Sequence, residues 1–147
     1  MSDLPARPDL PAVVSLEVPA TLGYLRVVCA CVVAACDLHS DAAHGVARDL
    51  ELAVQEIGSN AVLHAYRGRS DGWLRVEVAF DASGVTVVLI DAGREFVPSD
   101  ARDLEPGEVR VRGYGLHLLR RLMDEIDYRR EGDLNRWRLR REYPGGT

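Results

Sequence analysis

Glu56 and Asn60 are the residues of this 147-residue chain whose types and spacing best suit chemistry. A carboxylate and a carboxamide four positions apart project from one face of a helix. They lie in the second half of a long apolar helical segment, where helix propensity favours Ala or Leu over Asn. A carboxamide there competes with the backbone for hydrogen bonds, so it needs another partner. From the pair alone, that partner is either a bound ligand or the protein itself.

The helix that carries this pair is predicted to follow Ser40 and to run to about residue 66. Ser40 suits an N-cap, and Gly68 suits a helix stop. The 3.6-residue period of apolar residues predicts a buried stripe that includes Leu50, Val54, Ile57 and Ala61. On a helical wheel, Glu56 and Asn60 fall at the edge of this stripe. We therefore expect them to border the core rather than to point straight into solvent.

Two further sites, polar or glycine-rich, fall at the ends of predicted elements. Alternation predicts a half-buried strand over 73–80, and residues 85–90 predict a more fully buried strand in the same antiparallel hairpin. Asp91 and Gly93 follow the second strand directly, although a simple turn also explains them. Gly113-Tyr114-Gly115 precedes another helix, where a loop hinge is the structural alternative. The order and spacing of the three sites in one small domain are more informative than any site alone.

The remaining elements complete a predicted α+β fold, with a layer of helices on one face of a mixed, mostly antiparallel sheet. They are a strand over 13–18 ended by Pro19, an apolar helix over 21–38, a long connection over 94–112, a helix with the stripe Leu116, Leu119, Leu122, Met123 and Ile126, and strands over about 127–130 and 135–142. Long connections in compact domains are lids, binding loops or disordered. We expect one domain over 12–143, a flexible arm at 1–11 and a tail at 144–147.

Composition narrows the class of protein. The apolar share of 47% and charged share of 28% are typical of soluble globular domains. The net charge of −5 argues against nucleic-acid binding, although a local basic patch would be compatible with it. No apolar run approaches the roughly 20 residues of a membrane span, and the first residues are not a secretory signal, so we expect a cytoplasmic protein. Cys29, Cys31 and Cys36 match no zinc spacing and are interpreted as buried, reduced thiols.

The three sites resemble the N box, G1 box and G2 box of the histidine-kinase-like (GHKL) ATPases, which have the Bergerat fold, a two-layer sandwich. More narrowly, they resemble the bacterial anti-sigma-factor serine kinases of partner-switching systems. Glu-Ile-Gly-Ser-Asn-Ala-Val-Leu-His-Ala-Tyr over 56–66 matches that subgroup's helix, and 113–125 matches its G2 region and the helix that follows. The resemblance covers nearly the whole chain, from about Val13 to Glu142.

This resemblance implies ATP and Mg²⁺ as cofactors. Asn60 would coordinate Mg²⁺ through its carboxamide oxygen, because Mg²⁺ prefers hard oxygen ligands. Asp91 would accept a hydrogen bond from the adenine amino group, and Gly93 would allow the backbone to approach the base. Gly113 and Gly115 would let the loop wrap the phosphates.

The resemblance also implies a phosphotransfer reaction. Glu56 would be the general base that takes the proton from a substrate serine as it attacks the γ-phosphate. The helix starting near Leu116 would offer its N-terminal N–H groups to the phosphates. Arg112, together with Arg110, would either neutralise the γ-phosphate or remain a solvated charge of the lid. His64 is interpreted as structural. The implied partners are an anti-anti-sigma (STAS) protein as substrate, a sigma factor, and a second copy of the chain in a homodimer.

Two departures from the family pattern keep other functions open. Glu95 stands where the G1 box often has its second glycine, and residues 132–135, Gly-Asp-Leu-Asn, lack the threonine that many members carry before the last strand. One alternative is a nucleotide-binding regulatory module that sequesters partners with little kinase activity. Another is a switch kinase that does not act on a sigma factor.

Overall fold

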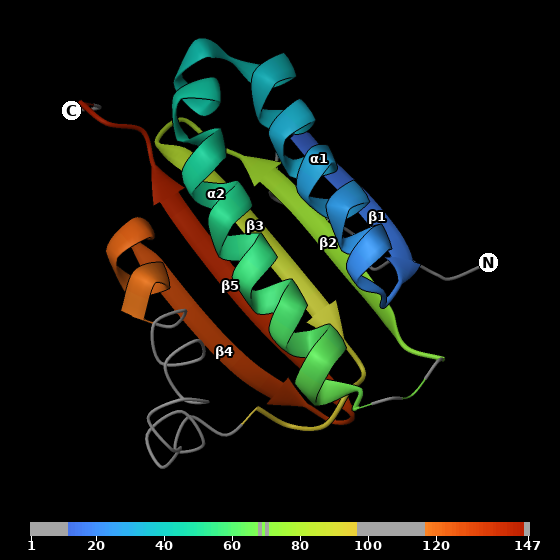
Figure 1. Cartoon of the computed structure of the whole chain (residues 1–147). Coiled ribbons are helices and arrows are strands. Elements are labelled where there is room, and N and C mark those ends of the chain that lie inside the picture. The colour runs from blue at the N-terminus through green and yellow to red at the C-terminus, as the bar shows by residue number, and fades with distance from the viewer. Residues whose placement is uncertain (1–11, 68, 70, 97–116, 146–147) are drawn as a thin grey trace.

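A five-stranded sheet carries two long helices on one of its faces (Figure 1). The computed structural model describes residues 12–67, 69, 71–96 and 117–145. The sheet order is β1-β2-β3-β5-β4, and its members are β1 (Ala12–Pro19), β2 (Trp73–Phe80), β3 (Gly84–Asp91), β4 (Glu125–Glu131) and β5 (Leu134–Glu142). The predicted α+β two-layer class is confirmed. Every described strand pair is antiparallel, whereas a mixed sheet was expected.

The second helix starts at its predicted cap, Ser40, and the first starts at a cap that was not predicted, Thr21. Helix α1 (Leu22–His39) starts after Thr21, whose hydroxyl accepts from the Tyr24 N–H, and α2 (Asp41–Asn60) starts after Ser40, whose hydroxyl accepts from the Ala43 N–H. A short π-helix, η1 (Ala61–Ala65), continues α2 to the predicted end of the segment. The core lies between the helices and the inward faces of the central strands, and its fully buried members include Leu25, Val32, Leu50, Val54, Val76, Val87 and Leu139.

The predicted last helix ends earlier than its apolar stripe suggested. Its described part covers 117–122, and Leu119 and Met123 are buried as expected. Ile126 was predicted to be helical, but it lies in β4 and pairs with Leu139 of β5. The Asp124 N–H donates to the Arg140 carbonyl at 2.8 Å, so the chain has already joined the sheet at this point. Pairing with the free edge of β5 therefore overrides the helical period.

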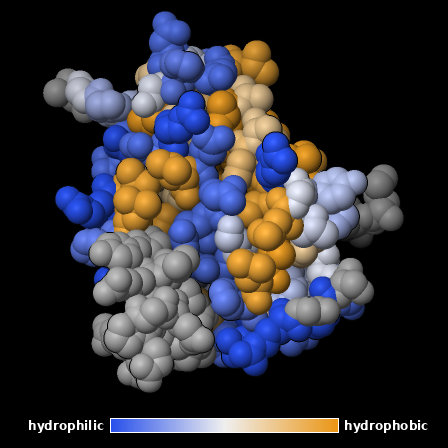
Figure 2. Space-filling view, viewed as in Figure 1, coloured by the Kyte–Doolittle hydropathy of each residue, from blue (hydrophilic) through white to orange (hydrophobic). Residues whose placement is uncertain are grey.

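Helix α1 is apolar on both sides. Among the described residues it is the one helix whose 18-residue length and mean hydropathy of 1.6 would suit a membrane span, which the sequence-based expectation did not allow for. Its inward side packs as a core helix, with Val28 fully buried. Its outward side leaves Tyr24 50% and Leu38 89% exposed, and Figure 2 shows apolar side chains gathered over the helix layer.

The two helices approach each other closely at Gly58. A Cβ at this position would lie 2.3 Å from Leu25 Cδ1, and Leu25 is completely buried in α1. The absence of a side chain at Gly58 therefore sets the distance between α1 and α2. Because Gly58 lies between Glu56 and Asn60, this contact also fixes the helical turn that carries the pair.

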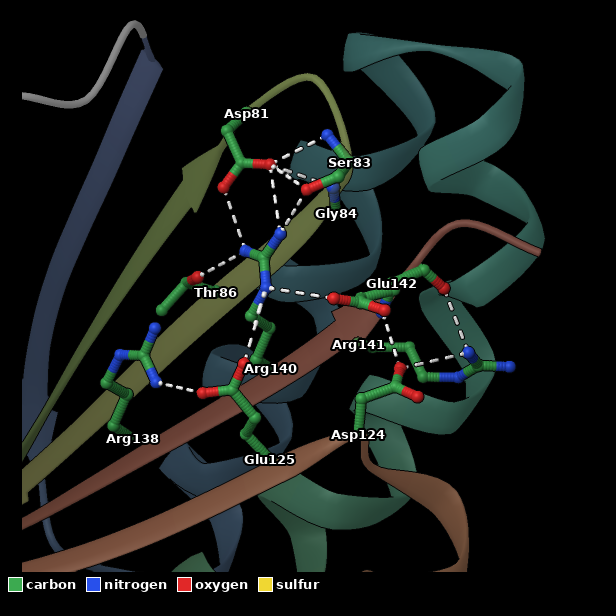
Figure 3. Close-up of polar contacts among 10 residues, drawn as sticks. All are labelled: Asp81, Ser83, Gly84, Thr86, Asp124, Glu125, Arg138, Arg140, Arg141 and Glu142. Atoms are coloured by element: carbon green, nitrogen blue, oxygen red, sulfur yellow. Dashed lines mark hydrogen bonds and ion pairs between the residues drawn. The ribbon is translucent and has the colours of Figure 1, made fainter. Parts of the chain in front are cut away.

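A polar cluster joins the β2–β3 turn to β5 (Figure 3). Arg140 is only 8% exposed. Its guanidinium donates to both Asp81 carboxylate oxygens at 2.8 and 3.1 Å and to the Ser83 and Thr86 hydroxyls. The Asp81 carboxylate also accepts from the backbone N–H groups of Ser83 and Gly84. The guanidinium holds the pKa of Asp81 well below its usual range, so the carboxylate stays charged in the folded protein.

Replacing Gly58 by alanine should destabilise the protein. Alanine is the better helix former by about 1 kcal/mol, but the clash with Leu25 should cost roughly 1–3 kcal/mol and outweigh it. Urea unfolding followed by circular dichroism measures the difference. Gly45, which has open space at its Cβ position in the same helix, is the matched control, and Gly45→Ala should stabilise. Equal stabilisation by both substitutions would contradict this account of the helix contact.

The Asp81–Arg140 pair should make stability depend on pH in a defined range. A carboxyl group whose pKa is lowered on folding adds stability above its unfolded pKa, near 3.8, and loses it as the pH falls below that value. Since the Asp81 side chain is 41% exposed, solvent screening should limit the effect to about 1 kcal/mol. The free energy of unfolding of Asp81→Asn should therefore be lower than that of the wild type at pH 6, and the gap should shrink below about pH 4. A gap that is unchanged at acid pH would contradict the assignment.

Candidate functional site

Glu56 and Asn60 occupy the last turn of α2, and each is half-buried at the edge of the core as predicted. Burial raises the pKa of the Glu56 carboxyl, and a side-chain hydrogen bond with Asn60 opposes that rise. An ionised carboxylate only accepts hydrogen bonds, so the Asn60 NH₂ group must be the donor. Within the described structure, Glu56 is therefore the partner of the Asn60 nitrogen, and the Asn60 carboxamide oxygen is not used in that bond.

The backbone changes character directly after Asn60. Tyr66 N–H donates to the Ala61 carbonyl at 3.0 Å, five residues back, which closes the π-turn η1. Single π-turns within helices occur frequently at functional sites. Here the wider turn brings Ala65 against the end of β3, where its carbonyl accepts from the Arg94 N–H at 2.9 Å.

Gly93 is the residue that permits this contact. A Cβ on Gly93 would lie 2.6 Å from the Ala65 Cβ and 2.8 Å from the Ala65 carbonyl carbon and oxygen. The close backbone approach that the structure contains is therefore to η1. The expected approach of Gly93 to a base stays a prediction.

Asp91 is a buried carboxylate at the end of β3, with 3% of its surface exposed. Its Oδ1 atom accepts from the Gly93 N–H and from Asn135 Nδ2, both at 2.8 Å. No hydrogen bond between described residues reaches Oδ2. Burial raises the pKa of Asp91, while the two donors and the nearby Arg130 charge act in the opposite direction. The carboxylate thus has one oxygen held by the protein and one without a partner among the described residues.

Asn135 was not predicted as a site residue, yet it is only 1% exposed and lies opposite Asp91 in the β3–β5 register. Its Nδ2 also donates to the carbonyls of Arg94 at 2.8 Å and Gly93 at 3.2 Å. Its Oδ1 accepts from the Tyr128 hydroxyl and from Arg130 Nη1 at 3.1 Å. A signal existed in the sequence: the inward positions of β5 alternate as Asn135, Trp137 and Leu139, which places one polar residue in an apolar row.

Tyr66 connects the two halves of the site. Its buried hydroxyl accepts from the Ala92 N–H at 2.8 Å and from the Trp73 N–H, and it donates to the Trp73 carbonyl at 2.6 Å. The end of η1, the start of β2 and the end of β3 therefore meet at one atom. This contact holds Asp91 in a fixed relation to the helix that carries Glu56 and Asn60.

The end of α2 and the end of β3 lie at the same end of the fold (Figure 1). The structure thereby brings together four of the predicted site residues, Glu56, Asn60, Asp91 and Gly93. The other four, Arg112, Gly113, Gly115 and Leu116, lie outside the described residues. Among the described residues, no group of three or more His, Cys, Asp or Glu side chains could hold a metal ion. The donor set nonetheless fits Mg²⁺, because this ion usually takes one or two protein ligands and completes its shell with phosphates and water.

Comparison with known proteins assigns the chain to a family. The model of the histidine kinase-like ATPase domain matches residues 18–141. The chain belongs to this family. A solved histidine kinase domain, from the blue-light-activated histidine kinase of Erythrobacter litoralis EL346, shares the histidine kinase-like fold with a TM-score of 0.53. That match has 18% sequence identity and covers 86% of this chain and 62% of the solved chain.

Curated relatives of this chain include two serine-protein kinases named RsbW. The one from Listeria monocytogenes serotype 4a (strain HCC23) is 34% identical over 86 residues, 53% of this chain and 55% of the relative. The one from Bacillus pumilus is 33% identical over 89 residues, 54% and 55% of the two chains. An anti-sigma F factor from Clostridium beijerinckii is 27% identical over 84 residues, 54% and 58%. The chain thus spans just over half the length of the curated relatives it matches.

The hydrogen bond between Glu56 and Asn60 should be visible in the titration of Glu56. In the wild type we expect the Glu56 pKa to exceed 4.5, because burial disfavours the charged form. Asn60→Ala removes a donor to the ionised carboxylate, so the pKa of Glu56 should rise further. Carboxyl-carbon NMR measures both values, and Gln55→Ala, an exposed neighbour, serves as the control. An unchanged or lower pKa in Asn60→Ala would disprove the contact.

Proposed function

We propose that this chain is an ATP-dependent serine/threonine kinase that phosphorylates an anti-anti-sigma (STAS) protein and also acts as an anti-sigma factor. The observation that carries the proposal is the buried Asp91 carboxylate, one oxygen of which has no partner among the described residues. It lies at the same end of the fold as the helical turn with Glu56 and Asn60. A base-binding acceptor close to a carboxylate and a carboxamide is what a nucleotide-dependent phosphotransfer site needs.

The nucleotide would be ATP. The ionised Asp91 would accept a hydrogen bond from the exocyclic amino group of adenine through its Oδ2 atom. In the glycine-rich segment, Gly113, Gly115 and the helix start at Leu116 would bind the phosphates through backbone N–H groups. Arg112 would neutralise the γ-phosphate. Membership of the histidine kinase-like ATPase family supports this assignment.

Asn60 is suited both to bind the metal ion and to orient the general base, Glu56. Its Nδ2 donates to Glu56, so its Oδ1 is available for Mg²⁺. Bound Mg²⁺ would neutralise phosphate charge during transfer. The carboxamide would therefore hold both Glu56 and the Mg²⁺ ion beside the phosphates.

Glu56 would act as the general base. Burial raises its pKa, which makes the carboxylate a stronger base than that of an exposed glutamate. It would take the proton from the serine or threonine hydroxyl of the STAS protein as that oxygen attacks the γ-phosphorus. The bond from the γ-phosphorus to the bridging oxygen of ADP breaks, and the proton stays on Glu56 until it passes to solvent.

The proposed protein partners are based on the names of the curated relatives. Two relatives carry the name serine-protein kinase and a third the name anti-sigma F factor. We therefore propose a STAS protein as the phosphate acceptor and a sigma factor as the second partner, with the chain acting as a homodimer in the cytoplasm.

A second candidate function is favoured by one residue. Glu95 stands at the second glycine position of the G1 box and is exposed at the start of the connection to the phosphate-binding segment. A side chain there restricts backbone freedom relative to glycine. This favours a regulatory module that binds nucleotide and sequesters partners with little catalysis. A kinase that switches a target other than a sigma factor would have the same site.

Substitutions at Glu56 and Asn60 should affect phosphotransfer and nucleotide binding differently. Glu56→Gln should bind Mg-ATP with nearly wild-type affinity but lose about 100-fold or more of the phosphotransfer rate, because only the base is removed. Asn60→Ala should weaken Mg-ATP binding by about tenfold or more, because a metal ligand is removed. Isothermal titration calorimetry measures binding, and transfer of labelled phosphate to a STAS protein measures the rate. Glu51→Gln, a carboxylate of α2 that pairs with Arg48, is the control.

The outcomes distinguish the candidates. Equal loss of Mg-ATP binding in both variants would show that the division of roles is wrong. Binding of Mg-ATP without phosphotransfer in the wild type, with unaltered partner binding by Glu56→Gln, would favour the regulatory module. A sigma factor retained by the immobilised protein would argue against a kinase with another target.

A further inference from the structure

We propose that Asn135 is the positioning residue that fixes Asp91 as an acceptor for the base and thereby sets the preference for a 6-amino purine over a 6-oxo purine. This inference rests on the proposed binding of ATP. It goes further because it assigns base discrimination to a residue of β5 that does not itself touch the base.

The orientation of the Asn135 amide is determined from both sides. Two donors, the Tyr128 hydroxyl and Arg130 Nη1, face its Oδ1 atom. The acceptors on the other side face its Nδ2 atom, and they are Asp91 Oδ1 and the carbonyl oxygens of Gly93 and Arg94. A flipped amide would set a donor against donors and an oxygen against three oxygens. Only one orientation satisfies the surroundings.

Tyr128 and Arg130 in turn are held in place. The Tyr128 oxygen accepts from the Phe96 N–H at 3.0 Å, which leaves the hydroxyl proton to point at Asn135. Arg130 Nη1 also donates to the Gly93 carbonyl at 2.7 Å. The network therefore runs from β4 through Asn135 to Asp91, with almost no freedom for the amide to turn.

This network favours the charged form of Asp91. Burial alone would favour the neutral acid, whereas the N–H donors of Asn135 and Gly93 favour the carboxylate. Among the described residues, the other titratable groups that face Asp91 are Arg130 from β4 and the hydroxyls of Tyr66 and Tyr128. The Arg130 charge favours the carboxylate, and the Asp91 charge raises the pKa of both tyrosines. Arg130 and Asn135 therefore both favour the carboxylate over the neutral acid, against the effect of burial.

The protonation state determines which base fits. A carboxylate can only accept, so its Oδ2 pairs with the 6-amino group of adenine and repels the 6-oxygen of hypoxanthine. A protonated Asp91 has an O–H that can donate to the 6-oxygen. A site built to hydrogen-bond one group rejects an analogue that leaves its buried polar atoms unpaired. Loss of the Asn135 N–H donor should therefore relax discrimination between ATP and ITP.

The experiment compares the dissociation constants of Mg-ATP and Mg-ITP between pH 5.5 and 8.5. The wild type should prefer ATP by about tenfold or more over this range. Asn135→Asp has nearly the same shape but places a second carboxylate beside Asp91, and two such groups share a proton. In this variant ATP binding should weaken about tenfold or more at pH 8.5, and the ATP/ITP ratio should fall toward one as the pH is lowered.

Three further variants make the test decisive. Asn135→Leu, without a polar atom, should lower the ATP/ITP ratio, and Tyr128→Phe, which removes one donor that orients the amide, should lower it less. Arg136→Gln, the next residue of β5 on the opposite face of the strand, should keep the wild-type ratio. Circular dichroism establishes that each variant is folded. If Asn135→Asp does not fold, Asn135→Leu and Tyr128→Phe carry the comparison.

Failure of this inference differs from failure of the proposed function. A wild type that binds ATP, together with folded Asn135 variants that keep its ATP/ITP ratio at every pH, overturns the role of Asn135 and leaves ATP binding intact. A wild type that binds neither nucleotide overturns the proposed function and this inference with it. A uniform loss of affinity for both nucleotides in the Asn135 variants, without a change of ratio or pH profile, identifies Asn135 as merely structural and also overturns the inference.

Discussion

The organisation of the site depends on one buried carboxylate. Asp91 is placed at the end of β3 with almost no exposure, and an ionised group in that position must be compensated by donors. The compensation comes from the Gly93 N–H and the Asn135 side chain, both on the same carboxylate oxygen. The other oxygen has no hydrogen-bond partner among the described residues. The β3–β5 pairing, the turn after β3 and the contacts of β4 all contribute to this arrangement.

Strand β3 is joined to β5 at each of its ends, each time through a different aspartate. Asp81, before β3, binds Arg140, and Asp91, at the end of β3, binds Asn135. The two contacts differ in their chemistry. The first is a charged pair near solvent that adds to stability, whereas the second is a fully buried amide–carboxylate contact in which orientation matters more than net energy. The central strands therefore have a rigid register at the end where the ligand is expected.

The helical side of the site is fixed by close contacts of small residues. Gly58 brings α1 against the turn that carries Glu56 and Asn60, and Gly93 brings the end of β3 against the π-turn at Ala65. The Tyr66 hydroxyl then joins the π-turn to β2 and to the backbone beside Asp91. Packing of this density leaves little room for independent movement of the two halves. The Asp91 carboxylate and the helical turn with Glu56 and Asn60 are consequently held as one unit.

The sequence by itself determined most of the periodic elements and singled out the residues whose types and spacing suit chemistry. The spacing of Glu56 and Asn60 and the alternation over 73–80 are local patterns, so both were readable without a structure. Only the tertiary structure decided that Asn135 faces Asp91, that Gly93 contacts η1, and that Ile126 joins a strand. These facts depend on contacts between segments that are far apart in the sequence. The register of such strands is set by the packing of the whole core, and the local periodicity of the sequence contains no information about it.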